Sequence, residues 1–266
     1  SIPVGIDGEL HASSVVFDDA NENGVLDPGE DGIARVAVSN GIDVVLTDAA
    51  GRYRLPVDDD TILFVVKPRN WAPPVNARGL PRFFYIHKPA GSPGGFRHPG
   101  VEPTGPLPDS VDFPLQKQPE AERFRMILFG DTQPKSIRDI DHLSHDIIEE
   151  VIGTDAAFGM TLGDLVSDDL SLFDPLNRAI SQIGIPWYSA IGNHDLNFDA
   201  SDDLHSDETF ESVYGPSTYA FAVGRAHFIV LDNIIYLGAE PGQRKRGGYS
   251  VGLSERQLSF VGHYLR

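Results

Sequence analysis

The chain has 266 residues, of which 41% are hydrophobic, and carries a formal net charge of −18 at pH 7. This length suffices for two domains, and the composition is that of a globular protein with a core, which excludes a disordered chain. The negative charge argues against binding to a nucleic-acid backbone, which requires clustered Lys and Arg. Because the sequence contains no cysteine, disulfides, thiolate metal sites and cysteine nucleophiles are excluded, and any metal must use oxygen and imidazole ligands.

Short β-rich runs separated by turn residues occupy residues 1–66. They are Ser14–Phe17, Ala34–Val38, Val44–Leu46, Tyr53–Leu55 and Thr61–Val66. Strands of this length and spacing predict an antiparallel β-sandwich. Proline and glycine dominate residues 67–119, for which we expect an extended connection laid over the surface; alternatively, this region includes the last sandwich strand.

One turn of this front region, residues 19–30, has the pattern of a twelve-residue calcium loop. Gly24 makes the sharp turn that the pattern requires. The expected ligands are the side chains of Asp19, Asn21, Asn23, Asp27 and Glu30 and the carbonyl of Val25. Strands instead of helices flank the loop, so it is not an ordinary EF-hand. We therefore predict a structural calcium ion, the alternative being an acidic, solvated turn.

The pattern changes in residues 120–266. Apolar runs at Phe124–Phe129, Ala156–Leu162 and Pro186–Ile191 alternate with helical patterns at Ile137–Ile152 and Leu170–Ile183. This alternation predicts an α/β domain with a mainly parallel sheet. Two further strands, Thr218–Val223 and His227–Asp232, follow each other directly, and Ser254 with Gln257 predicts the capped start of a last helix.

Each of the three apolar runs ends in a cluster of polar residues. The clusters are Gly130-Asp131-Thr132-Gln133, Gly163-Asp164-Leu165-Val166 and Gly192-Asn193-His194-Asp195. Because the carboxyl ends of parallel strands meet at one edge of a sheet, we expect Asp131, Asp164 and Asn193 to lie close together. A single Gly-Asp pair would indicate no more than a turn, but three clusters at matching strand ends predict a site.

The order of the clusters resembles the calcineurin-like metallophosphoesterases, and Gly-Asn-His-Asp is the most specific part of that resemblance. It covers roughly residues 120–266 and implies a four-layer αββα domain that hydrolyses phosphomonoesters or phosphodiesters with two metal ions (Mn, Fe, Zn or Mg). It also implies that Asp131 and Gln133 bind the first ion, Asp164 bridges both and Asn193 binds the second. By the same resemblance, His194 contacts the phosphate and protonates the leaving alkoxide.

The sequence departs from this family pattern in three ways. Gln133 replaces the usual histidine, which favours harder ions such as manganese or magnesium. Ser167 stands where many members carry the aspartate that orients the catalytic histidine, leaving Asp168, Asp169 or Asp195 for that role. The family's later histidine ligands do not occur before Arg266, so we expect a domain that is incomplete at its C-terminus, with little or no activity in this chain alone.

The front region is similar to the B-type repeats of bacterial surface adhesins and to the β-sandwich found before some bacterial calcineurin-like phosphoesterases. Calcium modules of this kind are typical of extracellular proteins, so we expect a periplasmic, extracellular or cell-surface protein. The sequence has no apolar stretch of the length of a membrane span. The expected partner is a phosphorylated substrate of unknown type. The alternative function is a cell-surface binding protein with a noncatalytic phosphoesterase scaffold.

Overall fold

The computed structural model describes residues 9–239 and 247–266. The strands are β1 (His11–Asp18), β2 (Ala37–Ser39), β3 (Val44–Leu46), β4 (Arg52–Pro56), β5 (Thr61–Val65), β6 (Trp71–Ala72), β7 (Phe84–His87), β8 (Phe113–Lys117), β9 (Met126–Phe129), β10 (Phe158–Leu162), β11 (Trp187–Ala190), β12 (Tyr219–Val223), β13 (Ala226–Val230), β14 (Ile234–Tyr236) and β15 (Tyr249–Val251). The helical elements are α1 (Ile137–Leu143), the π-helix η1 (Ser144–Ile148), α2 (Glu149–Val151), the 3₁₀-helix η2 (Leu170–Leu172), α3 (Phe173–Ile180), the 3₁₀-helix η3 (Ser181–Ile183), α4 (Glu208–Tyr214) and α5 (Glu255–Tyr264). No helix in the described ranges is long and apolar enough to cross a lipid bilayer.

The front region contains two four-stranded sheets, with strand orders β4-β1-β8-β6 and β3-β2-β5-β7. The alternation of buried and partly exposed residues along β1 is that of a strand with one face against a core. Residues of both sheets, among them Val16 and Leu115 of the first and Val38 and Phe64 of the second, belong to one buried cluster. All the pairings are antiparallel except that of β1 with β8, so the first sheet is mixed instead of purely antiparallel.

The Pro/Gly-rich connection of residues 67–119 contributes more structure than its composition indicates. It contains β7 (Phe84–His87), which lies at the edge of the β3-β2-β5-β7 sheet. It also contains β8 (Phe113–Lys117) and β6 (Trp71–Ala72), which complete the β4-β1-β8-β6 sheet. Phe113 and Leu115 are buried and anchor β8 beside β1. These strands are too short to produce an alternation that stands out among the surrounding prolines, which explains the expectation of a surface connection.

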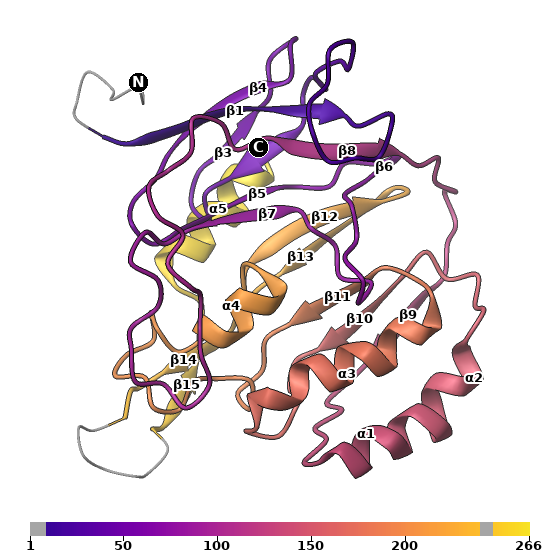
Figure 1. Ribbon diagram of the computed structural model, residues 1–266, viewed down its shortest axis with the longest axis vertical. Coiled ribbons are helices and arrows are strands. Elements are labelled where there is room, and N and C mark those ends of the chain that lie inside the picture. Colours follow the sequence, from indigo (N-terminus) through magenta and orange to yellow (C-terminus); the bar gives the residue numbers. More distant parts are fainter. Residues whose placement is uncertain (1–8, 240–246) are drawn as a thin grey trace.

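The predicted parallel sheet is formed by β9, β10 and β11, in the order β11-β10-β9. In Figure 1, α1 and α3 lie along one face of this sheet. On this side the buried cluster contains Ile140 of α1 and Leu176 of α3 together with Phe129, whose ring centroid is 4.8 Å from that of Trp187. The two predicted helical patterns are therefore present and cover the sheet.

The hairpin of β12 and β13 joins the front sheets to the parallel sheet, between which it lies in Figure 1. Phe221 of β12 forms a bridge with Lys67, and its ring is 5.3 Å from that of Phe158 in β10. Helix α5 begins at the predicted capping box. The ring centroid of its Phe260 is 5.6 Å from that of Phe64 in β5. One apolar core thus continues across the boundaries predicted for the domains and fixes the front region against the rest of the chain.

The other face of the parallel sheet is open in part, although Phe158 and Met160 on it are buried. Met126, Leu128 and Leu162 are 41%, 46% and 52% exposed on it. They line an apolar groove of about 720 Å³ that also includes residues of β13 and the segment after β15. Parallel sheets are normally covered on both faces, so this face differs from a finished α/β layer.

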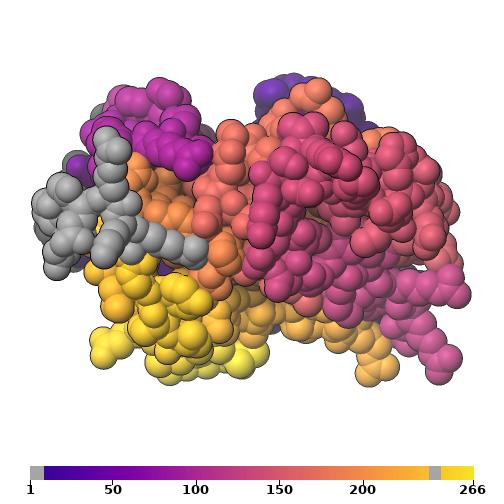
Figure 2. Space-filling model, turned by 90° about the horizontal axis from the view of Figure 1, so that it is seen from below, coloured from indigo at the N-terminus to yellow at the C-terminus, as the bar shows by residue number. Residues whose placement is uncertain are grey.

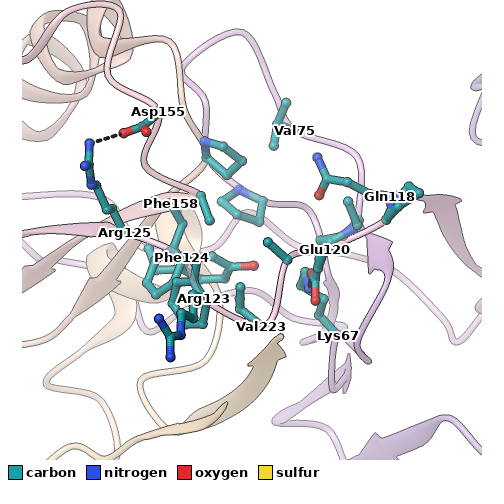
Figure 3. A pocket seen from close by; sticks show the side chains of 18 residues that line it. Lys67, Val75, Gln118, Glu120, Arg123, Phe124, Arg125, Asp155, Phe158 and Val223 are labelled. Atoms are coloured by element: carbon teal, nitrogen blue, oxygen red, sulfur yellow. Dashed lines mark hydrogen bonds and ion pairs between the residues drawn. The ribbon is translucent and has the colours of Figure 1, made fainter. Parts of the chain in front are cut away.

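A cavity of about 680 Å³ lies at the amino ends of the parallel strands (Figure 3). Its wall includes Arg125, Ala157 and Pro186, each of which directly precedes a strand of the sheet. The buried ion pair between Lys67 Nζ and Glu120 Oε1, 2.5 Å long, lies at the side of the front region. None of the residues predicted to bind metal lines this cavity.

Candidate functional site

The first two polar clusters directly follow β9 and β10, and the third follows β11 after Ile191, at the carboxyl edge of the parallel sheet. The register pairs Thr161 with Phe129 on one side and with Ser189 on the other, so the three strands end side by side. Asp131 is exposed in the first loop, while Asp164 and Asn193 are partly buried in the second and third. The predicted convergence of the three loops at one edge is therefore present in the fold.

Asp164 connects the three loops through both of its carboxylate oxygens. Its Oδ2 accepts a hydrogen bond of 2.7 Å from Gln133 Nε2, and its Oδ1 accepts one of 2.9 Å from the backbone N–H of His194. The backbone N–H of Gln133 also donates to the carbonyl of Asp164, at 3.1 Å. In this arrangement Gln133 directs its amide nitrogen towards Asp164, so the side chain has to turn before its oxygen can bind a cation.

The loops hold their polar residues in a backbone conformation that L-residues rarely adopt. Within the described residues seven positions other than glycine have positive φ, and Asp131 (56°), Gln133 (39°), Asp164 (49°) and Asp168 (66°) are four of them. Gly192 is required beside them, because a Cβ there would lie 2.1 Å from the nitrogen of Asp164. Such conformations cost about 1–3 kcal/mol each and cluster at functional sites.

His194 forms its side-chain contact with Asp168, one of the three partners that the sequence left open. The His194 Nδ1 atom is 2.6 Å from Asp168 Oδ1, and the backbone N–H of Asp168 donates to the His194 carbonyl at 3.3 Å. Asp169 instead accepts from Ser171, through the hydroxyl at 2.7 Å, at the start of η2. Asp168 therefore orients the histidine.

Asp195, the third candidate for orienting His194 and the residue predicted beside it as catalytic, has a different location. It is fully buried and accepts backbone N–H groups from Leu165 (3.1 Å), Val166 (3.1 Å) and Gly192 (2.9 Å). Burial raises the pKa of Asp195 to about 7, against the lowering effect of these three donors. The side chain thus holds the second and third loops together and does not contact the His194 ring.

A second group with metal-ligand chemistry lies between the front region and α4. One ligand atom each from Asp60, His205 and Glu208 lies within 4.8 Å of the others. Lys88 Nζ already occupies this place, at 2.8 Å from Asp60 Oδ1 and 2.5 Å from Glu208 Oε1. His205, which the sequence analysis did not assign to any site, also bonds to Asp202 Oδ1 at 2.7 Å. The ammonium group supplies the cation that these carboxylates require.

The predicted calcium loop follows β1 and is closed by hydrogen bonds among its expected ligands. The almost fully buried Asp19 accepts the backbone N–H groups of Asn23 (3.1 Å) and Gly24 (3.0 Å). The amides of Asn21 and Asn23 both donate to Asp27 Oδ2, at 2.9 and 2.8 Å, and lower the pKa of Asp27.

The end of the loop folds back on its beginning. Glu30 accepts the N–H of Ala20 at Oε1 and that of Asp27 at Oε2, each at 3.0 Å. Gly24 has a φ of 76°, as the sharp turn of the pattern requires. The fold therefore brings the side chains of Asp19, Asp27 and Glu30 into one short loop, in which Val25 is exposed.

Residues 20–97 match the family model described as "N terminal of Calcineurin-like phosphoesterase". The match confirms the predicted resemblance to calcineurin-like metallophosphoesterases, and in particular to the domain that precedes their catalytic part. It covers the front region after β1, with all but the first residue of the calcium loop, and none of the three polar clusters. No curated protein matches the sequence significantly.

Among solved structures, the purple acid phosphatase PPD1 from yellow lupin (Lupinus luteus) seeds is similar, with a TM-score of 0.33 and 14% sequence identity. The similarity covers 77% of this chain and 45% of the phosphatase chain. This chain thus corresponds to less than half the length of that enzyme.

Proposed function

We propose that the protein is a metal-dependent phosphoester hydrolase whose site is the carboxyl edge of β9, β10 and β11. The observation that carries the proposal is the position of Asp164, whose two oxygens reach the Gln133 and His194 loops at 2.7 and 2.9 Å. A carboxylate at the junction of three loops is suited to bridge two cations. The front-domain match to calcineurin-like phosphoesterases supports the same function.

The donor set fits hard or borderline divalent ions. Asp131 and Gln133 would hold the first ion, Asn193 the second, and Asp164 both; all of these donors are oxygens, which suit manganese or magnesium better than zinc. Two bound ions would clamp the phosphate oxygens and lower the pKa of a water molecule for in-line attack. The formal charge of −18 makes such cations necessary for attraction of an anionic phosphoester.

His194 is the proton donor in this proposal. The Asp168 carboxylate accepts the Nδ1 proton of His194, which leaves Nε2 as the atom that faces a substrate. In the imidazolium form, Nε2–H donates its proton to the leaving oxygen as the P–O bond breaks. Asp168 stabilises that form and keeps the ring in one orientation.

We expect Asp168→Asn to lower the rate of phosphoester hydrolysis by about 10–100-fold, the usual effect of losing the partner that orients a functional side chain. The asparagine keeps the shape but loses the charge that stabilises the His194 imidazolium. The measurement is kcat/KM for p-nitrophenyl phosphate with manganese at pH 7. Asp169→Asn serves as the matched control, and equal losses in the two variants would contradict the assignment to Asp168.

The open apolar face of the parallel sheet supports the proposal that the catalytic domain is completed by further polypeptide into a four-layer αββα arrangement. Leu128 and Leu162 would be covered in such a domain. The test of function therefore uses the full-length polypeptide, with p-nitrophenyl phosphate and bis-p-nitrophenyl phosphate as monoester and diester. Tight manganese binding without turnover of either substrate would favour the alternative of a noncatalytic scaffold that binds partners at the cell surface.

The loop of residues 19–30 is proposed to bind a structural calcium ion. In support, Asp19, Asp27 and Glu30 lie in one loop whose charges repel each other in the absence of a cation, and the loop closes on itself through Glu30. Extracellular calcium modules bind calcium with Kd values of about 0.1–1 mM, where the ion is abundant, and on this ground we also propose that the protein is exported to the periplasm or to the outside of a bacterial cell.

Calcium removal is expected to lower the melting temperature by roughly 5–10 °C. An ion at a hundredfold excess over its Kd adds about 2.7 kcal/mol to the free energy of unfolding. In a protein of this size, each kcal/mol changes the melting temperature by about 2–4 °C. The measurement is differential scanning calorimetry in calcium and in chelator. Glu30→Ala should abolish the difference, whereas Glu22→Ala, at a position of the loop that provides no ligand, should retain it. An unchanged melting temperature in wild type would contradict a structural calcium ion.

A further inference from the structure

The cavity of about 680 Å³ shown in Figure 3 lies where the front region meets the amino ends of the parallel strands. Residues between 67 and 81 line one side of it, and residues between 118 and 125 line a second. The third side is formed by the beginnings of β10 and β11. Cavities of about 300–1,000 Å³ at the meeting of two domains are a usual location of small-molecule sites. Because Asp164 lies at the other edge of the sheet, this cavity is separate from the proposed hydrolytic site.

Rings form much of the cavity wall. They are those of Pro73, Pro81, Pro119, Pro186, Phe124, Phe158 and Tyr188. The ring centroid of Phe158 is 6.1 Å from that of Phe124 and 5.8 Å from that of Tyr188, which in turn is stacked on Phe221 at 4.0 Å. Each proline fixes its own φ. A wall that is already fixed loses little conformational entropy when a ligand binds, and its rings favour an apolar ring as the ligand.

The buried charges of the cavity are satisfied by the protein itself. Lys67 Nζ donates to Glu120 Oε1 at 2.5 Å and to the carbonyl of Ala222 at 2.7 Å. The second oxygen of Glu120, Oε2, accepts the backbone N–H of Gly224 at 2.8 Å. This ion pair therefore closes one side of the cavity and does not require a charged ligand.

The charges at the rim of the cavity also favour an uncharged ligand. Arg125 Nη1 is 2.9 Å from Asp155 Oδ1, as the dashed line in Figure 3 shows, so these two groups neutralise each other. Arg123 is exposed to water. An exposed ion pair with Arg123 would stabilise a bound anion only weakly, whereas the transfer of a carboxylate from water to an apolar cavity is costly.

Tyr188 brings a hydrogen-bonding group without a partner to this cavity. The residue is only 4% exposed, and within the described residues 9–239 and 247–266 its hydroxyl forms no hydrogen bond. The hydroxyl of the neighbouring Tyr219, in contrast, donates to the carbonyl of Ser189 at 2.9 Å. Burial and the charge of Glu120 raise the pKa of Tyr188, so the hydroxyl stays protonated and can donate. A buried tyrosine hydroxyl normally has a partner, which an oxygen atom of a ligand would supply.

We propose that this cavity binds a small uncharged molecule that consists of an apolar ring and an oxygen acceptor, such as a carbonyl, to which Tyr188 donates a hydrogen bond. The ring packs against the proline and phenylalanine rings of the wall. This second site does not depend on the proposed phosphoester hydrolysis, because it shares no residue with the metal site.

The test is a fluorine NMR titration with three probes that share one ring and differ in one group. The probes are 4-fluoroacetophenone, 1-ethyl-4-fluorobenzene and 4-fluorobenzoate. The ketone should bind about fivefold more tightly than the ethyl compound, as one hydrogen bond predicts. It should bind about tenfold more tightly than the carboxylate, which loses its hydration. Tyr188→Phe should bring the ketone to within about twofold of the ethyl compound and leave binding of the ethyl compound unchanged.

A second variant tests the location of the site. Ala157 lines the cavity and is exposed, so Ala157→Phe should fold and weaken binding of the ketone by about tenfold or more, because its ring takes the place of the ligand ring. The matched control is Ala190→Phe, which adds the same ring to the apolar groove. That groove shares Phe158 with the cavity and is also lined by Val251 and Leu253. The C-terminal residues (yellow) lie across the face shown in Figure 2 from those around α1 and α2 (pink). Ala190→Phe should leave the affinity for the ketone unchanged.

The inference is overturned if wild type does not bind the ketone or if Tyr188→Phe retains the full preference for it. Equal weakening by Ala157→Phe and Ala190→Phe would place the probes in the groove and overturn the inference as well. Tighter binding of 4-fluorobenzoate that is lost in Arg123→Gln would show that the cavity selects anions, which contradicts the proposed class of ligand. Melting temperatures of all variants close to that of wild type confirm that the affinities refer to folded protein.

Discussion

Asp164→Asn is expected to lower phosphoester hydrolysis by at least about 10³-fold, more than the 10–100-fold typical of losing an outer-shell partner. The substitution removes the charge that would be shared by two cations while it retains the size of the side chain. It also replaces Oδ2, which accepts from Gln133, or Oδ1, which accepts from His194, by a donor. In either case the loop of Asp164 loses its hydrogen bond to one neighbouring loop, and the site loses a charged ligand.

The measurement combines kcat/KM for p-nitrophenyl phosphate with manganese binding followed by electron paramagnetic resonance. Both should fall in Asp164→Asn, and the melting temperature should change little in comparison. Asp141→Asn, which changes an exposed aspartate on α1, removes the same charge from the surface and should leave both quantities unchanged. Full activity in Asp164→Asn would exclude the proposed two-metal mechanism.

The strands and helices of the second half could be predicted from the sequence because their periodicity is strong. The apolar runs that end at Phe129, Leu162 and Ile191 include β9, β10 and β11, and the polar clusters follow from where those runs stop. The front strands were also recognisable from their spacing. The parallel pairing of β1 with β8 was not, because it joins Val16 to Phe113 across a long, proline-rich segment that contains no helix.

The partner of His194 could not be predicted, because three aspartates were available within reach of the chain. The choice of Asp168 depends on its left-handed backbone, with φ of 66°, which directs the side chain back to the histidine. Asp195 is adjacent to His194 in sequence, yet its side chain points into the loops and accepts three N–H groups. Loop conformation decided between these candidates, and residue type carries little information about it.

Contacts between distant segments were equally invisible in the sequence. Lys88 and Glu208 are 120 positions apart, and the backbone N–H of Arg97, in a segment whose composition indicates only a loop, donates to Asp199 102 positions away. Yet these contacts place the connection against the second half of the chain. Lys88 forms a fully buried ion pair, and its removal is the second large effect that we expect.

Lys88→Met is expected to destabilise the protein by about 3–5 kcal/mol, the usual cost of leaving a buried charge without its partner. Lys88 is 4% exposed at its side chain and Glu208 is fully buried, with 2.5 Å between Nζ and Oε1. Burial alone would lower the pKa of Lys88, but the carboxylates of Asp60 and Glu208 raise it above its usual value, so the ammonium is fully charged. Without it, Glu208 must protonate or draw water into the core.

Urea unfolding at pH 7 measures this change, with Lys117→Met as the matched control. Lys117 also pairs with an aspartate, Asp18, but its side chain is 69% exposed, so we expect a loss below about 1 kcal/mol. The double variant Lys88→Met/Glu208→Gln should recover part of the loss, because the unpaired charge is then absent. A loss below 1 kcal/mol in Lys88→Met would show that water already reaches Glu208.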